Sequence, residues 1–234
     1  MQRFYKSVTV EALEPASAFA VLLDRKPMQT PARNPLQVPS VALARAIAAE
    51  WEAQSDEIAA ESMPLTQVVA TALDRISPDT PYHAQQIAAY GETDLVCYRA
   101  DNSQALAARQ MSVWQPLVDW TAETFSAPLA ITDGVTPVTQ ALATLTALRD
   151  AVAAHDIFEM SALGLATTAS GSLIIALALS HGRIDADTAF EAGYLDETWQ
   201  VEKWGSDEEA EVRQQTARAD LNTAAQFFTL YRGR

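Results

Sequence analysis

The sequence predicts an α+β protein that is mostly helical, with a small β-rich N-terminal domain (residues 1–60) followed by an all-α helical bundle domain (residues 61–234). Three observations support this fold class. Alternating side chains in the first 39 residues are typical of strands. After Pro39, apolar residues recur every three to four positions, as on helices. The run 160–182 has no charged side chain for more than twenty residues, which indicates a helix enclosed by other helices.

The N-terminal segment predicts strands joined by turns. Residues 4–10 alternate in a first strand, and Phe19–Leu23 form a second. The turn Asp24–Pro27 then leads to a hairpin partner at Met28–Thr30. Three prolines limit the next segment to short extended pieces: Pro31, Pro35 and Pro39.

Helical signals begin directly after Pro39. Ser40 suits an N-cap, and Pro64 suits the first turn of a second helix. The segment Ser77–Pro81 is expected to break the chain before a third helix that runs to about Gly91. The next segment, Asp94–Arg99, fits either a short helix or an extended piece.

The second half of the chain predicts further helices. Ser103 caps a long one, which Pro116 should kink or split near Ser112. A loop over 127–136 precedes another amphipathic helix after Pro137. The uncharged run forms one helix, or two that meet near Gly171.

The C-terminal region predicts an acidic helix and a final helix. The acidic helix extends from Asp185 to Trp204 and is ended by Gly205. Ser206 with Glu209 three residues later has the spacing of a capping box, which would start the last helix.

The uncharged run is long enough to raise the question of a membrane span. Its middle, Thr167–Ser172, is small and hydroxylated, and no basic cluster or interfacial aromatic flanks it. We therefore expect a core helix and no membrane insertion.

Composition and charge narrow the classes of partner. The formal charge of −14 and the isoelectric point near 4.5 argue against nucleic acid as a partner. A cationic or mixed-charge protein surface fits better. The single cysteine, Cys97, excludes an internal disulfide, and the N-terminus lacks an apolar signal segment. A cytoplasmic location is expected.

A search for catalytic motifs finds none. The eight glycines form no nucleotide-binding fingerprint, and the three histidines lack metal-ligand spacing and are expected at the surface or in caps. We predict no cofactor, no metal and no catalytic residue. Cys97 is expected to be a buried apolar side chain. Three tryptophans are expected to be core anchors: Trp51, Trp114 and Trp120.

The most unusual segment is 185–211, which contains ten acidic residues, a single basic residue, Lys203, and four aromatic residues. Carboxylate pairs such as Asp187 with Glu191, or Glu197 with Glu202, leave open a hydrolase or a divalent-ion site. A solvated acidic face is the favoured interpretation, because carboxylates of one helix diverge. Trp199 and Trp204 are five residues apart and must occupy different helix faces, so at least one should be exposed. The segment therefore predicts a binding surface.

Several blocks of the chain resemble one known family. They lie at Phe4–Val10, Lys26–Leu36, Glu50–Gln54, Met63–Thr66, Asp94–Arg99, Trp114–Leu117, Leu195–Glu197 with Gln200, and Lys203–Gly205. In this order they are similar to the ATP synthase assembly chaperones dedicated to the alpha subunit, found in mitochondria and alpha-proteobacteria. The resemblance covers nearly the whole chain.

This resemblance implies a fold and a function. The fold would be a small domain of strands and helix followed by an orthogonal helical bundle. The function would be to bind the unassembled alpha subunit, shield its subunit interface and release it into the catalytic sector, without nucleotide hydrolysis. We expect a monomer when free, in the cytoplasm, or in the mitochondrial matrix for eukaryotic relatives. The implied partner-binding residues are Glu197, Gln200, Trp204, Gly205 and Glu208.

Two alternatives stay open beside this interpretation. One is a carboxylate- or metal-dependent hydrolase that uses the 185–211 segment. The other is a permanent structural subunit of a larger assembly. Gly205 also has a purely structural explanation as a helix cap, and Glu208 as a side chain that suits the helix dipole.

Overall fold

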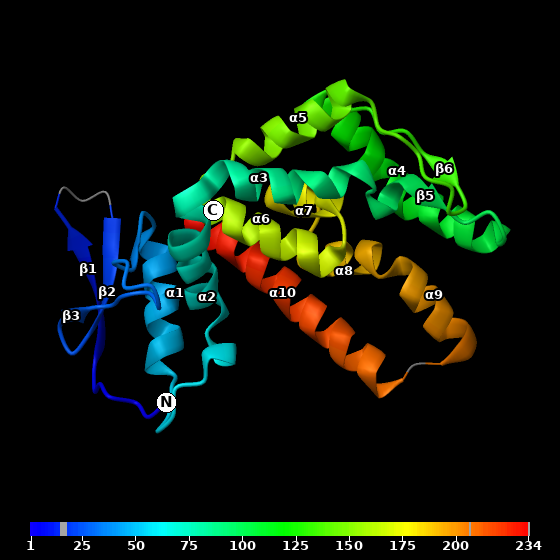
Figure 1. The fold of residues 1–234 in the computed structure, drawn as a ribbon. Coiled ribbons are helices and arrows are strands. Elements are labelled where there is room, and N and C mark those ends of the chain that lie inside the picture. The colour runs from blue at the N-terminus through cyan, green and yellow to red at the C-terminus, as the bar shows by residue number, and fades with distance from the viewer. Residues whose placement is uncertain (15–17, 206, 234) are drawn as a thin grey trace. The chain divides into compact units, whose positions relative to one another are not determined.

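The structure is a computed structural model that describes residues 1–14, 18–205 and 207–233 (Figure 1). The chain divides into two compact units. Unit 1 comprises Met1–Thr80, Asp156–Ala162 and Gln226–Arg234, and unit 2 comprises Pro81–His155 and Leu163–Ala225. The predicted class, α+β and mostly helical with a small N-terminal sheet, is confirmed.

The strands and longer helices are as follows, in chain order: β1 (Val8–Leu13), β2 (Ala18–Leu23), β3 (Lys26–Pro27), β4 (Gln37–Val38), α1 (Val41–Glu52), α2 (Pro64–Thr71), α3 (Thr80–Ala88), β5 (Tyr98–Arg99), α4 (Gln104–Phe125), β6 (Thr132–Asp133), α5 (Leu142–Ala153), α6 (Ile157–Ser170), α7 (Leu173–Ser180), α8 (Ala186–Gly193), α9 (Leu195–Trp204) and α10 (Glu208–Arg232). Short 3₁₀ or π segments separate some of them: η1 (Ala60–Ser62), η2 (Ala72–Ile76), η3 (Ser77–Asp79), η4 (Ala89–Glu92) and η5 (Leu95–Cys97). In the part of the chain that the structure describes, no helix is both long and apolar enough to cross a bilayer.

The sheet of unit 1 is organised around β2. Strand β1 pairs antiparallel with one edge of β2, and β3 and β4 both pair with the other edge. The hairpin turn is tighter than predicted, because Asp24 and Arg25 both take positive φ angles of 48° and 68° and Lys26–Pro27 already form a strand. The Asp24 carboxylate accepts hydrogen bonds from the backbone N–H groups of Lys6 and Ser7, at 3.0–3.2 Å. These bonds tie the turn to the chain before β1.

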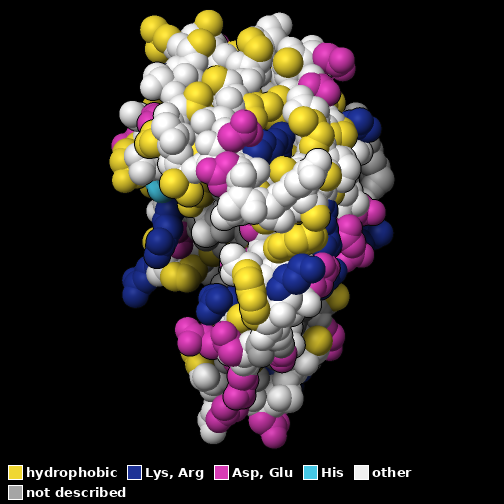
Figure 2. All heavy atoms as spheres, turned by 90° about the vertical axis from the view of Figure 1, so that its right-hand side faces the viewer, with side chains coloured by type: hydrophobic (Ala, Val, Ile, Leu, Met, Phe, Trp, Pro, Cys, Tyr) yellow, Lys and Arg dark blue, Asp and Glu magenta, His cyan; other side chains and the backbone are white. Residues whose placement is uncertain are grey.

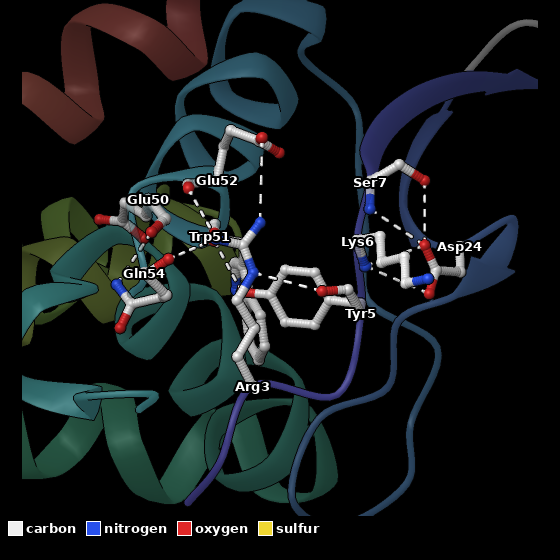
Figure 3. A network of polar contacts seen from close by, with 9 residues as sticks. All are labelled: Arg3, Tyr5, Lys6, Ser7, Asp24, Glu50, Trp51, Glu52 and Gln54. Atoms are coloured by element: carbon white, nitrogen blue, oxygen red, sulfur yellow. Dashed lines mark hydrogen bonds and ion pairs between the residues drawn. The ribbon is translucent and has the colours of Figure 1, made fainter. Parts of the chain in front are cut away.

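A polar network ties the N-terminus to the end of α1 (Figure 3). The Arg3 guanidinium donates to the carbonyls of Glu52 and Gln54, where the helix dipole favours a cation. Tyr5 donates its hydroxyl proton to the Trp51 carbonyl, at 2.6 Å. Much of the Glu50–Gln54 block therefore has a structural role.

Glu50 performs a second structural task, at the start of α2. Its carboxylate accepts hydrogen bonds from the N–H groups of Leu65 and Thr66, at 2.7 and 2.9 Å. It thereby satisfies donors that the first turn of a helix leaves unpaired. Burial raises the pKa of Glu50, and the hydrogen bonds from Thr66 and Leu65 act in the opposite direction.

The predicted break at Ser77–Pro81 is wrong, because the chain stays helical from Pro64 to Glu92. The i→i−4 ladder changes to a π-turn over Ala72–Ile76 and to a 3₁₀ turn over Ser77–Asp79, and α3 follows directly. These changes of pitch accommodate prolines that lack an N–H donor. Helix α4 likewise runs unbroken through Pro116, so of the predicted kink or split near Ser112 the split does not occur.

The core of unit 2 contains α7, and every residue of α7 is at most 4% exposed. The prediction of two helices that meet near Gly171 is confirmed, since Gly171 has φ of 70° between α6 and α7. Asp94 lies at this junction and is 1% exposed. Its carboxylate accepts from Ser172 Oγ at 2.6 Å, from Ile174 N at 3.1 Å and from Val96 N at 3.2 Å. One side chain thus caps both η5 and α7.

The predicted acidic helix Asp185–Trp204 is two helices, α8 and α9. The indole of Trp114 donates its N–H to the Ala192 carbonyl at 2.8 Å, so this carbonyl is engaged at the point where α8 ends. Gly193 follows, and a Cβ atom there would lie 2.7 Å from the Ser170 carbonyl oxygen. Only glycine allows the chain to pass α6 this closely.

A short parallel pair, β5 with β6, was not predicted for the loop over 127–136. Buried Gln140 holds this loop by accepting from the N–H of Ala130 and donating to its carbonyl, both at 2.9 Å. The same amide contacts the sulfur of Cys97. Cys97 is fully buried, as predicted, and burial raises its pKa to about 12.

Asp94 should make the free energy of unfolding of unit 2 depend on pH. Burial, partly offset by the hydrogen bonds of Ser172 and the helix N–H groups, raises its pKa from 3.8 to about 6. The folded protein therefore holds this proton between about pH 4 and 6, where the unfolded chain has lost it. This contribution to the free energy of unfolding is present below pH 4 and is lost as the pH rises through 6, by about 3 kcal/mol in all.

The measurement compares wild type with Asp94→Asn by urea unfolding at pH 7.0, 5.5 and 4.5. As the pH falls, wild type should gain stability relative to the variant. Parallel pH profiles for the two proteins would show that Asp94 is ionised in both states.

Candidate functional site

The five residues assigned to partner binding lie on α9 and the start of α10, within unit 2. Figure 1 shows the two helices meeting at a tip. The side chains of Glu197, Gln200 and Glu208 are exposed, and Trp204 is 79% exposed. Gly205 ends α9 with φ of 84°, a conformation that favours glycine. The tip therefore presents one large aromatic side chain among polar ones.

Trp204 differs from the other tryptophans of the chain. Trp114 is 2% exposed and is a core anchor as predicted, whereas Trp51, Trp120 and Trp199 are half-buried. The Lys203 ammonium lies 5.0 Å from the Trp199 ring. Trp204 makes no hydrogen bond or ring contact with any described residue. This confirms that at least one of the two tryptophans of α9 is exposed.

Acidic side chains follow Trp204 closely in the chain, at the start of α10. Asp207 accepts a hydrogen bond from Ala210 N at 2.8 Å and so caps α10, while the predicted capping residue, Ser206, lies outside the described residues. Exposed carboxylates follow in the first turn: Glu208, Glu209 and Glu211. Figure 2 shows acidic side chains gathered at the lower end of this face, where α9 gives way to α10. We call the following residues the acidic tip: Trp204, the carboxylates Glu208, Glu209 and Glu211 of α10, and the carboxylates Asp196, Glu197 and Glu202 of α9.

The charge of the chain is concentrated in the same unit. Unit 2 contains seven basic and eighteen acidic residues, a formal charge of −11, whereas unit 1 contains nine and twelve, a charge of −3. The unit that bears the acidic tip therefore attracts cationic surfaces most strongly.

Helix α9 is bound to α4 by polar side-chain contacts. Leu195, its first residue, is its one buried residue. Gln110 donates its amide N–H to the Asp196 carboxylate at 2.8 Å. Arg109 donates to both carboxylate oxygens of Glu202, at 2.8 and 2.9 Å. These α4 contacts position the helix that carries Glu197 and Gln200.

No individual role was predicted for Gln110, Arg109 or Asp196. Asp196 lies within the block Leu195–Glu197, but its partner is 86 residues away in the chain. No local spacing signals such a pair.

Three carboxylates of the 185–211 segment are bound to side chains of other helices in unit 2. Asp187 is paired with Arg218 at 2.5 Å, and Asp196 and Glu202 are each bound to α4. Among the described residues, no three His, Cys, Asp or Glu side chains are placed to hold a metal ion. Asp187, Asp196 and Glu202 therefore each have a structural partner.

Other polar groups of the chain also have structural partners. His155 was expected at the surface or in a cap, and it lies just after the end of α5, where the residue is 7% exposed. Its ring nitrogens lie 3.0 Å from the Ala151 carbonyl and 2.7 Å from Ser180 Oγ. A groove of about 440 Å³ in unit 1 has ten lining residues and no charged or histidine side chain among them. Neither the surroundings of His155 nor this groove combines an accessible nucleophile with a base among the described residues.

Comparisons with known proteins agree on one group of relatives. A family model described as ATP12 chaperone protein matches residues 2–122. The fold is similar to that of Atp12 from Paracoccus denitrificans, at 43% identity over 98% of both chains with a TM-score of 0.93. A point mutant of that protein matches at 42% identity over 98% of this chain and 97% of that one, also at 0.93. A chaperone candidate from Agrobacterium tumefaciens matches at 37% identity, over 98% of this chain and 85% of that one, at 0.92.

The exposure of Trp204 predicts that it contributes little to folding. Trp204→Ala should change the free energy of unfolding by less than about 0.5 kcal/mol, because the indole is 79% exposed and makes no hydrogen bond or ring contact with a described residue. Trp114→Ala, the control, should cost about 3–5 kcal/mol, since it leaves a cavity and an unpaired carbonyl. Urea titration followed by circular dichroism measures both. A large loss of stability in Trp204→Ala would mean that the indole supports the α9–α10 connection.

Proposed function

The chain belongs to the ATP12 chaperone family, and from this we propose that it binds the unassembled ATP synthase alpha subunit, shields its subunit interface and releases it into the catalytic sector. The observation that carries the proposal is the acidic tip: a tryptophan that is 79% exposed and is bordered by exposed carboxylates. A large apolar side chain kept in water without a folding role is typical of a binding hot spot.

The physical requirements of such a chaperone match this surface. An unassembled subunit exposes the surface that its later neighbour will cover, and that surface aggregates. The chaperone must cover it with moderate affinity, so that the proper neighbour can displace it. Trp204 supplies burial at a small entropy cost, and the surrounding carboxylates orient the complex toward basic groups of the alpha subunit.

The proposed contact residues have distinct tasks. Trp204 is the anchor. Glu197, Gln200 and Glu208 form a polar rim around it. Gly205 allows the chain to reverse between α9 and α10 with φ of 84° and so brings the two sides of the rim together.

The alternatives make different predictions. A hydrolase that uses the acidic segment would turn over a substrate and lose that activity in Glu197→Gln. A permanent structural subunit would co-purify with its complex at a fixed stoichiometry. A chaperone leaves the complex, so it should bind alpha subunit only before assembly.

The first test is whether the protein keeps freshly diluted alpha subunit soluble, followed by light scattering. Wild type should suppress aggregation. Trp204→Ala should weaken binding about 30-fold, as expected for a hot spot of about 2 kcal/mol. Glu208→Lys should weaken it about tenfold by placing a cation against a basic client surface.

Glu61→Lys provides the matched control, because it makes the same charge change at an exposed position of unit 1. It should leave protection unchanged, and circular dichroism verifies that each variant is folded. Absence of protection by wild type would refute alpha-subunit binding. Equal loss in Glu61→Lys and Glu208→Lys would show that only total charge matters.

Salt should act mainly on the rate of association. All carboxylates of the tip except Asp196 are exposed, and exposed charges are screened within about 8 Å at physiological ionic strength. Raising the salt from about 50 to 500 mM should therefore slow association about tenfold and change dissociation much less. Stopped-flow fluorescence measures both rates, and Glu208→Gln should show a weaker salt dependence than wild type. An association rate independent of salt would exclude electrostatic steering by the tip.

A further inference from the structure

Arg99, on β5 in unit 2, is a buried cation without a hydrogen-bond partner. The residue is 6% exposed, and Nε, Nη1 and Nη2 are all shielded from solvent and form no hydrogen bond with any described residue. One face of the guanidinium lies over the Trp114 ring, at 5.2 Å from its centroid. Burying a charge without hydrogen-bonded partners is strongly unfavourable. A guanidinium kept in this state therefore points to a carboxylate that it binds in another arrangement of the protein.

Two carboxylates are near enough to act on Arg99. Burial lowers the pKa of the guanidinium, and the charges of Asp133 and Asp196 act in the opposite direction. Neither forms an ion pair with it, because Asp196 is bound to Gln110 and Asp133 is exposed. The cation thus has two candidate partners on two different segments.

The two candidates differ in how freely they can approach. Asp133 belongs to β6, which is paired in register with Arg99 itself, and the next residue, Gly134, donates its N–H to the Arg99 carbonyl at 2.7 Å. That strand pair fixes the backbone of Asp133, so only its side chain can turn. Asp196 belongs to α9, where Leu195 is the one buried residue. A small rotation of α9 would move Asp196 while the core stays in place.

The position of Gln110 supports such a transfer. Its amide donates to Asp196, while its carbonyl oxygen accepts from the N–H of Ala100, the residue after Arg99. The carboxylate is therefore already held beside the strand that carries the guanidinium. A pair between Arg99 and Asp196 would replace a bond to a neutral amide with a charge-assisted one that can be bidentate.

We propose that α9 has two docked positions on unit 2, one with Asp196 on Gln110 and one with Asp196 on Arg99, and that engagement of the client favours the second. Arg99 is then a positioning residue for the acidic tip. In the free protein, the partly exposed ion pair between Arg109 and Glu202 stabilises the first position, in which Asp196 is bound to Gln110. The inference rests on the proposed function for its client step, but the two positions are a property of the chain alone.

The free protein provides the first test. Spin labels at Ala108→Cys on α4 and Lys203→Cys on α9 report the distance between these helices, and buried Cys97, with a pKa of about 12, should not react. Arg109→Ala removes the ion pair with Glu202 and should produce a second, shifted distance population. Adding Asp196→Asn should abolish that population, because the neutral amide can still bind Gln110 but cannot form an ion pair with the guanidinium. A single unchanged distance in all three proteins would overturn the proposal.

The second test adds alpha subunit. The same labels should shift toward the second population in an otherwise unsubstituted chain and in Asp133→Asn, the matched control, but not in Asp196→Asn. A shift in Asp196→Asn, or its loss in Asp133→Asn, would contradict the assignment. If alpha subunit does not bind at all, the proposed function fails, and the experiment on the free protein still decides whether α9 has two positions.

Stability separates a positioning role from a structural one. Arg99→Met keeps the volume beside Trp114 and removes the unpaired charge, so the urea midpoint should stay equal or rise while protection of alpha subunit falls about tenfold. Arg99→Lys, which keeps a buried cation, should retain more protection than Arg99→Met. A structural ion pair would behave differently, with stability and protection lost together in Arg99→Met, and that outcome would refute the proposal.

Discussion

The buried carboxylate of Asp94 is the interaction on which unit 2 depends most. Helix α7 is apolar on every side, so it lies within the core, but its N-terminal N–H groups must still be satisfied there. Asp94 accepts from Ser172 and Ile174 and also caps η5, which leads directly into β5 and Arg99. The most buried helix and the strand that carries the unpaired guanidinium are thus fixed by the same side chain.

Local signals predicted most of the elements, and contacts distant in sequence caused the errors. Ser40 caps α1 and Pro64 begins α2, as expected, because the energy of a cap depends on adjacent residues. The acidic helix was predicted as one piece, since nothing nearby reveals that Trp114 binds the Ala192 carbonyl. The pair β5–β6 was missed for a similar reason: two residues per strand are too few for a periodic pattern.

The candidate site could be predicted only in part. Composition alone indicated an acidic, aromatic segment, and the family resemblance narrowed it to particular residues of α9 and α10. The exposure of Trp204 follows from a helix that ends at Gly205 with few side chains around it. Arg99 ends one of the blocks that resemble the family, but no role was predicted for it, because its three nitrogens are seen to be buried without an acceptor among the described residues only in the structure. Burial of a charge is a property of the fold, not of the local sequence.

The bond between Asp94 and Ser172 joins residues 78 positions apart, and this separation has a consequence for how the chain folds. A loop of that length must close before the α7 N-terminus gains its cap, and the entropy of closure opposes that step. Until then, the long uncharged run of α6 and α7 lacks the partners that cover it. Such a segment is prone to self-association during synthesis. A protein that we propose protects an aggregation-prone subunit therefore passes through a vulnerable stage of its own.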